Sequence, residues 1–155
     1  MYQLRETRGK NLDNAYIAGF IDGEGYIGLE FREHNGIRSD LTPRIVISNS
    51  DKKILEWIQQ KFGGYISQRQ ENPKWKISYK LRFNSQETIN LLLATYKFLR
   101  VKKGQALLAL HSWTNKKRNI KQFQGYLDKN ELERREQWYM QMKQMNRRGS
   151  PAETK

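Results

Sequence analysis

Two pairs of alternating segments, each followed by a helical pattern, constrain the fold of this chain more than any other feature. In the first pair every second residue from Ile27 to Phe31 is apolar, and after Asn35-Gly36 the alternation runs on through residues 41–49. A period of two places the apolar side chains on one face of a strand. Because Asn-Gly between two such runs favours a tight turn, we expect an antiparallel hairpin.

The second pair is predicted over residues 65–70 and 74–83, joined by turn residues 71–73. Apolar residues at helical spacing follow each pair, with Ser50 and Ser85 as the expected N-caps. Helices and antiparallel strand pairs are therefore mixed along the chain. This order indicates the α+β class, with a four-stranded antiparallel sheet.

Further helices are expected outside these pairs. Asp13-Asn14 can start a helix ahead of the first strand, and residues 102–113 and about 120–145 have helical spacing. Residues 149–155 begin with Gly-Ser-Pro, and we expect them to form a disordered tail. The remaining residues, 1–148, are predicted to form one domain.

The polar faces of the predicted strands carry Arg, Lys, Ser, Thr and Tyr side chains. Such a face can be simply the wet side of a half-buried sheet. It can also lie along a duplex, where it would contact phosphates and base edges. On this second interpretation the DNA-binding residues are Glu30, Arg32, His34, Arg38, Thr42, Arg44, Ser48, Tyr65, Ser67, Arg69, Lys74, Lys76, Ser78, Lys80 and Arg82, with Lys116, Lys117 and Arg118 on phosphates.

The net charge favours a nucleic-acid partner over a solvated basic surface without one. The chain has 29 Lys and Arg against 16 Asp and Glu, a formal charge of +13. Each phosphate that such a surface neutralises releases condensed counterions. The absence of Cys excludes disulfides, zinc fingers and a thiol nucleophile.

No membrane role is expected, because no apolar run approaches the roughly 20 residues that span a bilayer. Residues 1–10 are polar and lack the apolar stretch of a secretory signal. We therefore expect a soluble intracellular protein of the cytoplasm, nucleoid or an organelle matrix, and not a secreted one.

Residues 16–25, with the sequence YIAGFIDGEG, resemble the ten-residue signature of the LAGLIDADG homing endonuclease family. The resemblance extends over roughly residues 13–113 and implies the αββαββα core of that family, with its four-stranded sheet forming a saddle over DNA. This chain contains one copy of the signature, so it resembles the single-motif members that work as homodimers. The dimer interface would then include Ala18, Gly19, Asp22 and Gly23, with Asp22 as a brace for the helix seam.

The resemblance also implies a reaction, hydrolysis of DNA phosphodiester bonds with Mg²⁺ or its substitute Mn²⁺. Glu24 matches the metal-binding acid of the family, and the carbonyl of Gly23 is an additional expected ligand. Lys102 matches a basic residue beside the scissile phosphate. Asn49 matches a polar residue that organises active-site water, and Lys53 would complete a basic pocket.

Three functions remain open from the sequence. The first is a site-specific endonuclease involved in intron homing, acting on a pseudo-palindromic target of about 20 base pairs. The second is an intron maturase that binds RNA, and the third is a nucleic-acid-binding regulator without catalysis. An intact Glu24 and Lys102 argue against the third.

Overall fold

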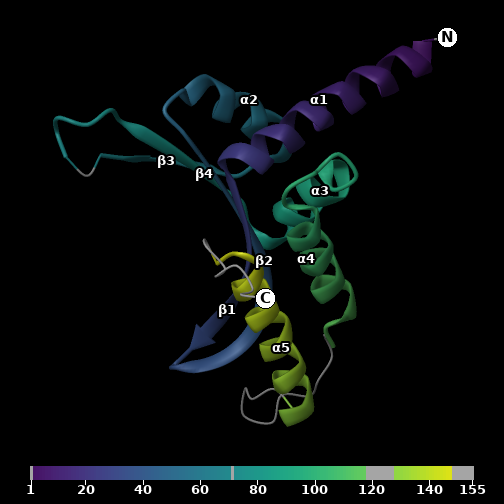
Figure 1. Cartoon of the computed structure of the whole chain (residues 1–155), viewed down its shortest axis with the longest axis vertical. Coiled ribbons are helices and arrows are strands. Elements are labelled where there is room, and N and C mark those ends of the chain that lie inside the picture. Colours follow the sequence, from purple (N-terminus) through teal and green to yellow (C-terminus); the bar gives the residue numbers. More distant parts are fainter. Residues whose placement is uncertain (1, 71, 118–127, 148–155) are drawn as a thin grey trace, which may run out of the picture.

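A computed structural model describes residues 2–70, 72–117 and 128–147, with side chains described for residues 9–33, 35–70, 72–117 and 128–147. The elements are α1 (Tyr2–Glu24), β1 (Gly25–His34), β2 (Ile37–Asn49), α2 (Lys52–Phe62), β3 (Tyr65–Arg69), β4 (Ser78–Arg82), α3 (Ser85–Thr95), α4 (Lys103–Asn115) and α5 (Lys129–Met145). Figure 1 shows them in sequence colours. The α+β class and the αββαββα order of the core are confirmed.

The four strands form one antiparallel sheet in the order β1-β2-β4-β3. The β1–β2 hairpin turns at Asn35 and Gly36, whose φ angles are 51° and 76°. Two consecutive positive φ angles are the requirement of the tight turn that Asn-Gly favours, so this expectation is also confirmed. The pairing register shifts between Arg32 and Glu33, where the strand is irregular.

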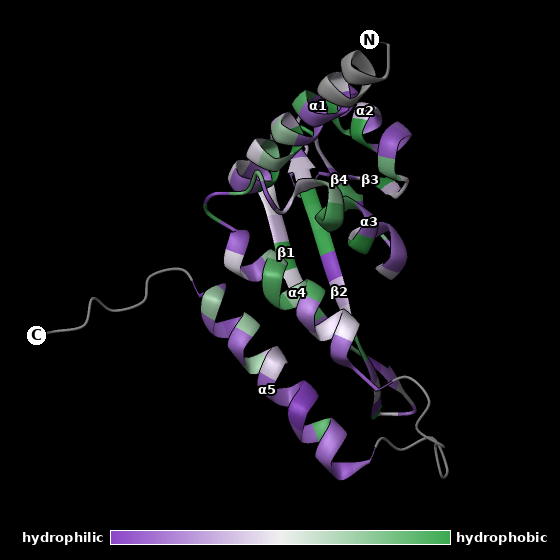
Figure 2. Ribbon diagram, turned by 90° about the vertical axis from the view of Figure 1, so that its right-hand side faces the viewer, coloured by the Kyte–Doolittle hydropathy of each residue, from purple (hydrophilic) through white to green (hydrophobic). Residues whose placement is uncertain are grey.

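The hydrophobic core lies between the sheet and the helices (Figure 2). Most of the apolar side chains that alternate along the strands are buried, as predicted, while Phe31, Ile66 and Tyr79 are partly buried. The fully buried members include Ile17 and Ile21 of α1, Ile27, Ile45, Ile47 and Leu81 of the sheet, Leu55 and Ile58 of α2, and Leu91 and Leu92 of α3. Ala106 and Ala109 of α4 and Met142 of α5 join the same core. One continuous core therefore fixes α1, α4 and α5 relative to the sheet.

Three predicted helix boundaries are wrong. The N-cap of α2 is Asp51, whose carboxylate accepts from the Lys53 amide, and not Ser50. The N-cap of α3 is Asn84, which forms a reciprocal capping box with Glu87, and not Ser85. A side-chain acceptor one residue away satisfies the same free amides in each case. Helix α1 begins at Tyr2, eleven residues before the predicted start at Asp13.

The other boundaries differ less. Strand β4 begins at Ser78 rather than residue 74, so Lys74 and Lys76 lie in the turn between β3 and β4. Helix α4 agrees with the predicted residues 102–113 within two residues. Helix α5 covers the second part of the predicted helix at 120–145, and both residues 118–127 and the predicted tail at 149–155 lie outside the described residues. No helix in the described ranges is long and apolar enough to cross a membrane.

Candidate functional site

A groove of about 720 Å³ lies where the end of α1, the outer face of the sheet, the start of α4 and the end of α5 meet. Its charged lining consists of Glu24, Arg44, Lys80, Arg82, Lys102 and Arg147. Within the described part of the chain, Glu24 is the one acid of this lining, among five cations. The groove therefore combines a carboxylate with a surface that attracts phosphates.

The position of Glu24 follows from the corner between α1 and β1. Helix α1 ends at Glu24 and strand β1 begins at Gly25 without an intervening loop. A Cβ atom at Gly25 would lie 2.7 Å from the backbone oxygen of Ile21, which is too close for any other residue. This glycine lets the chain turn sharply, and the turn leaves the Glu24 side chain exposed at the groove.

Asp22 connects the end of α1 to the segment that precedes α4. Its carboxylate accepts hydrogen bonds from the amides of Arg100 at 2.7 Å, Lys102 at 2.8 Å and Val101 at 3.2 Å. We call this set of contacts the Asp22 clamp. Partial burial alone would raise the pKa of Asp22, but the three amide hydrogen bonds and the Lys102 charge hold that pKa below its ordinary value. The sequence analysis predicted Asp22 as a brace for the helix seam between two copies, which stays a prediction, whereas the contacts described here lie within one chain.

Lys102 belongs to the same clamp and lines the groove with Glu24. Its ammonium group donates a hydrogen bond to the backbone oxygen of Asp22 at the end of α1. The free carbonyls of a helix C-terminus carry a partial negative charge, so the cation is favoured there. The structure thus brings together Glu24 and Lys102, which are 78 residues apart in the sequence.

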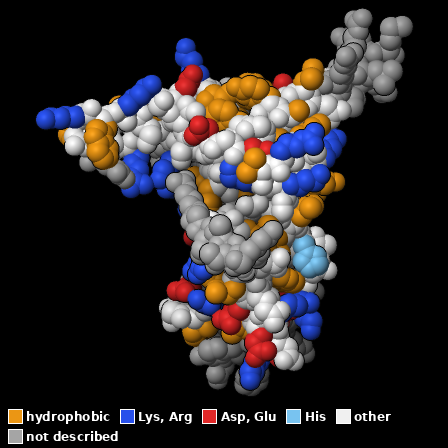
Figure 3. All heavy atoms as spheres, in the orientation of Figure 1, with side chains coloured by type: hydrophobic (Ala, Val, Ile, Leu, Met, Phe, Trp, Pro, Cys, Tyr) orange, Lys and Arg blue, Asp and Glu red, His pale blue; other side chains and the backbone are white. Residues whose placement is uncertain are grey.

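The outer face of the sheet is the polar face predicted from the sequence. Residues directly opposite in antiparallel strands point to the same face, and Ser48 pairs with Lys80, which in turn pairs with Ser67. The same register aligns Tyr65 with Arg82 and Arg69 with Ser78. Space-filling spheres show Lys and Arg gathered over the arm formed by β3 and β4 (Figure 3).

Several members of this face already have partners. Arg44 forms an ion pair with Glu30 at 2.5 Å, and Arg32 donates to the Ser85 hydroxyl at 3.1 Å. Thr42 is the exception to the exposed face, because its side chain is buried and its hydroxyl donates to the Glu30 carbonyl. The prediction of Thr42 as a DNA contact is therefore corrected.

Two predicted active-site residues lie away from the groove. Asn49 is at the end of β2, where its side-chain oxygen accepts from the Asp51 amide at 2.7 Å. Its strand position puts it on the face opposite to Ser48, and Ser48 is the residue that lines the groove. Lys53 is exposed in the first turn of α2 and is not part of the groove lining.

Two predicted DNA contacts are instead structural. Arg38 forms an ion pair with Glu136 of α5 at 3.0 Å and lies over the Phe31 ring at 4.7 Å. Lys116 is buried, and its ammonium donates to both carboxylate oxygens of Asp40 at 2.9 Å. Lys117 is exposed as predicted. Arg118 and the His34 side chain lie outside the described residues.

The exposed side of α1 carries a stripe formed by Leu12, Tyr16, Gly19 and Gly23. The sequence analysis assigned only the two glycines of this stripe to the dimer interface. Leu12 and Tyr16 are 66% and 57% exposed, and Gly19 and Gly23 follow on the same side at spacings of three and four residues. A Cβ atom at either glycine would meet nothing in this chain within 4 Å. Ala18 is fully buried in the core of its own chain, which corrects its assignment to the interface.

Sequence analysis missed the contribution of the C-terminal region to the groove. Met145, Asn146 and Arg147, at the end of α5, line the groove together with Glu24. The basic composition of this region was the one available signal, and it did not identify which cation faces the groove.

The donor set of the groove fits a hard divalent cation. Mg²⁺ is bound by oxygen atoms and usually keeps several waters, with one or two carboxylates and phosphates completing its shell. Glu24 supplies an exposed carboxylate, and the adjacent backbone can add a carbonyl. No cluster of three or more His, Cys, Asp or Glu occurs among the described residues, so one chain alone offers a sparse site.

Comparisons with known proteins agree with this geometry. The family model described as LAGLIDADG endonuclease matches residues 17–126. The structure is similar to the homing endonuclease I-CvuI in complex with its target in the presence of calcium, with a TM-score of 0.71 and 19% identity over 92% of this chain and 87% of that chain. It is also similar to the archaeal intron-encoded homing endonuclease I-Vdi141I complexed with DNA, with a TM-score of 0.64 and 23% identity over 91% and 88% of the two chains.

A comparison with curated proteins found no match. At such low identities the structural likeness establishes the fold, while the family model covers most of the sequence, including all of the signature after its first residue, the sheet and Lys102. The chain therefore belongs to the LAGLIDADG endonuclease family and is a site-specific DNA endonuclease.

Proposed function

We propose that two copies of this chain form a homodimer that hydrolyses both strands of a pseudo-palindromic DNA target of about 20 base pairs. The observation that carries the proposal is the groove, in which the Glu24 carboxylate is the one acid among the cations that its described lining contains. A second copy would supply the second carboxylate that a two-strand reaction needs.

The exposed stripe of α1 supports the homodimer. Leu12 and Tyr16 offer apolar surface, and Gly19 and Gly23 leave room for the backbone of a second helix. A twofold axis through this stripe would give an interface in which each copy presents the same residues. Because Glu24 follows Gly23 directly, the two Glu24 side chains would lie on either side of that axis.

Divalent metal ions fit this arrangement. Two carboxylates close together repel each other, and bound Mg²⁺ offsets that repulsion. When bound, the metal supplies an activated water and stabilises the leaving oxygen. Within the chain, Glu24 would hold the metal with help from the Gly23 carbonyl, and Lys102 would offset charge that develops on the phosphate.

The length of the sheet supports the length of the target. Strand β1 has 10 residues. At about 3.4 Å per residue it spans roughly 34 Å, or about 10 base pairs of duplex. Arg44, Lys80 and Arg82 on the outer face would contact one half-site, and the twofold copy would contact the other.

The first experiment identifies the target and then tests cleavage. Duplexes with a randomised segment of about 24 base pairs, slightly longer than the expected target, are selected for binding in Ca²⁺. The selected sequence is placed in a supercoiled plasmid and incubated with Mg²⁺. Glu24→Gln should lower the cleavage rate by about three orders of magnitude or more while DNA binding is retained. Glu56→Gln is the matched control, because Glu56 is a half-exposed acid of α2 that pairs with Lys52, and this variant should cut like the wild type.

Two outcomes would contradict the proposal. Equal cleavage by wild type and Glu24→Gln would remove Glu24 from the reaction. A selected sequence without twofold symmetry would contradict the homodimer.

The second experiment tests assembly directly. Gly19→Leu should convert the dimer to a monomer in sedimentation velocity and abolish double-strand cleavage, because the added side chain keeps the helices apart. Asn11→Leu is the control, since residue 11 is exposed on the same helix but points about 120° away from the centre of the stripe. An active wild-type monomer on DNA would refute the shared site.

A further inference from the structure

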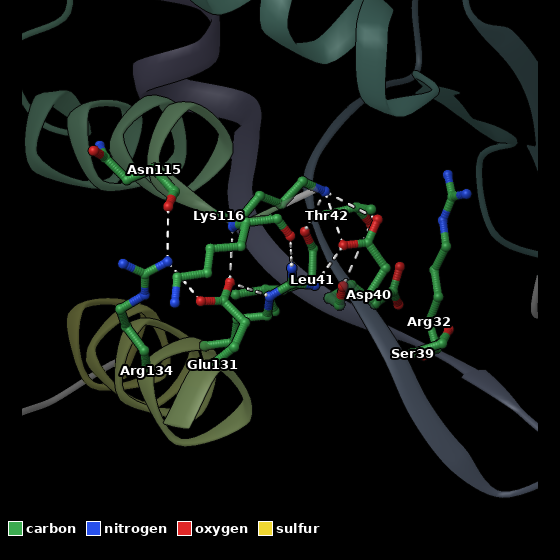
Figure 4. Close-up of polar contacts among 12 residues, drawn as sticks. Arg32, Ser39, Asp40, Leu41, Thr42, Asn115, Lys116, Glu131 and Arg134 are labelled. Atoms are coloured by element: carbon green, nitrogen blue, oxygen red, sulfur yellow. Dashed lines mark hydrogen bonds and ion pairs between the residues drawn. The ribbon is translucent and has the colours of Figure 1, made fainter. Parts of the chain in front are cut away.

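The C-terminal helix α5 is fixed to the rest of the domain by a buried network of charges (Figure 4). Arg135, whose side chain is 3% exposed, donates to Asp40 of β2 and to Glu131 of α5, both at 2.8 Å. Glu131 also accepts from the Lys117 amide at 3.0 Å, and Lys116 donates to Asp40. This network ties the first half of α5 to the β1–β2 hairpin and to the end of α4.

The network also uses basic residues of the C-terminal part of the chain, whose basic composition would suit the RNA-binding alternative. Lys116, Arg134 and Arg135 all pair with acids of the same chain. Burial of the Lys116 and Arg135 charges is tolerated because their pairs are hydrogen-bonded, while the Arg134 side chain is 38% exposed. Lys116 and Arg135 are therefore not available to a polyanion, and we do not propose a maturase function.

The other end of α5 is held beside the groove. Met142 is buried in the core. The side-chain Nδ2 of Asn146 donates to the Ile27 carbonyl of β1 at 2.9 Å. Met145 contacts α4 so closely that a Cβ atom at Gly104 would lie 2.6 Å from its methyl group. The chain at residues 145–147 is therefore positioned by both β1 and α4.

Because residues 145 and 146 are fixed in this way, Arg147 lies at the groove. It is exposed, it lines the groove with Glu24 and Lys102, and no described residue pairs with its guanidinium. The backbone of this arginine is anchored through its neighbours, and its side chain lines a groove that contains one carboxylate and four other cations. The fork of donors on a guanidinium suits two phosphate oxygens.

We propose that Arg147 is a phosphate-binding residue of the active site, contacting the DNA backbone beside the phosphate that Glu24 and Lys102 act on. This assignment rests on the proposed function. Helix α5 then has two tasks, since it covers the core and it completes the wall of the groove with a cation from the far end of the chain.

Arg147→Ala, Arg147→Lys and Lys129→Ala test this assignment on the selected duplex. Lys129→Ala is the matched control, because this substitution removes the same charge from the opposite end of the same helix. The Lys129 side chain is 87% exposed there. Cleavage at saturating protein should fall by about 10- to 100-fold in Arg147→Ala. Arg147→Lys should recover only part of this rate. Lysine restores the positive charge, but its ammonium group lacks the paired donors of the guanidinium.

Salt dependence supplies a readout that does not require cleavage. In Ca²⁺, the slope of log affinity against log salt should become less steep in Arg147→Ala. The change should be about 0.9 for each phosphate that the arginine neutralises in the wild type, or about 1.8 for two subunits. Arg147→Lys should keep the wild-type slope, and Lys129→Ala should change neither slope nor rate. Thermal unfolding should show that all variants are as stable as the wild type.

The assignment is overturned if Arg147→Ala matches Lys129→Ala in both slope and rate. A wild type that binds the duplex but never cuts would instead refute the proposed nuclease function. The salt slopes would still decide whether Arg147 contacts phosphate.

Discussion

Replacing Asp22 with Asn tests the Asp22 clamp and, through it, the placement of Lys102. The carboxylate accepts three amide hydrogen bonds, two through one oxygen and one through the other. An Asn side chain has a single oxygen, so its amino group must face at least one backbone N–H that then lacks an acceptor. A hydrogen bond to a charged group contributes about 1.5–3 kcal/mol and a neutral one about 0.5–1.5 kcal/mol.

The destabilisation can be estimated from these hydrogen bonds. One amide is left without an acceptor, and the other two exchange a charged acceptor for a neutral one. Because the site is half-buried, the low end of each range applies, and Asp22→Asn should lower the free energy of unfolding by about 2 kcal/mol at pH 7. The control Asp13→Asn, which breaks an exposed pair with Lys61 on the same helix, should cost about 0.5 kcal/mol.

The difference between wild type and Asp22→Asn should depend on pH. The pKa of Asp22 is lowered in the folded state, so its contribution is present above the unfolded pKa, near 3.8, and is lost as the pH falls through the folded value. Urea unfolding at a fixed protomer concentration, at pH 7 and at the lowest pH at which the protein folds, measures this difference. A destabilisation that is absent at pH 7, or equal at both pH values, would refute the clamp.

Three further predictions concern other parts of the fold. Lys116→Met should destabilise the protein by about 2 kcal/mol, because it leaves Asp40 and a backbone carbonyl without this donor. Its control, Lys117→Ala at an exposed residue, should change the stability by no more than about 0.5 kcal/mol. Equal urea midpoints for the two variants would show that the buried network is dispensable. Gly36→Val should lower the free energy of unfolding by at least about 1 kcal/mol, since a β-branched residue is strained at the φ of 76° found at this position. An unchanged urea midpoint would argue against the turn. Glu30→Gln should release Arg44 from its ion pair and strengthen DNA binding at low salt, measured by anisotropy; weaker binding would mean that Glu30 orients Arg44 for DNA.

The sheet was predictable because burial on one face enforces strict alternation. Shifting β2 by one residue would place Ile45 and Ile47 in water and Arg44 in the core, so the pattern determines the register. The Asn35-Gly36 turn was predictable for a local reason, since few residue pairs adopt two positive φ angles. The helix caps were less certain, because Asn49, Ser50 and Asp51 are three neighbouring residues that can all accept an amide hydrogen bond.

The buried network was not predictable from the sequence. Asp40 meets Lys116 and Arg135, which lie 76 and 95 residues further along the chain. Nothing in the local pattern distinguishes these cations from the exposed Lys117, and a run of basic residues in a basic protein suggests a phosphate-binding surface. The same limit applies to Arg147, whose role depends on where α5 ends in space.

The two acids of the signature show how geometry separates residues that the sequence presents alike. Asp22 and Glu24 are two positions apart, and two residues of an α-helix at this spacing point in directions about 200° apart. One carboxylate therefore turns inward to the amides of residues 100–102, where its charge is used by hydrogen bonds. The other turns outward to the groove, where water, metal ions and phosphate can reach it. Since the inward acid also fixes the segment that carries Lys102, Asp22 shapes the same site in which Glu24 is proposed to bind the metal, and the two acids do so from opposite sides of one helix.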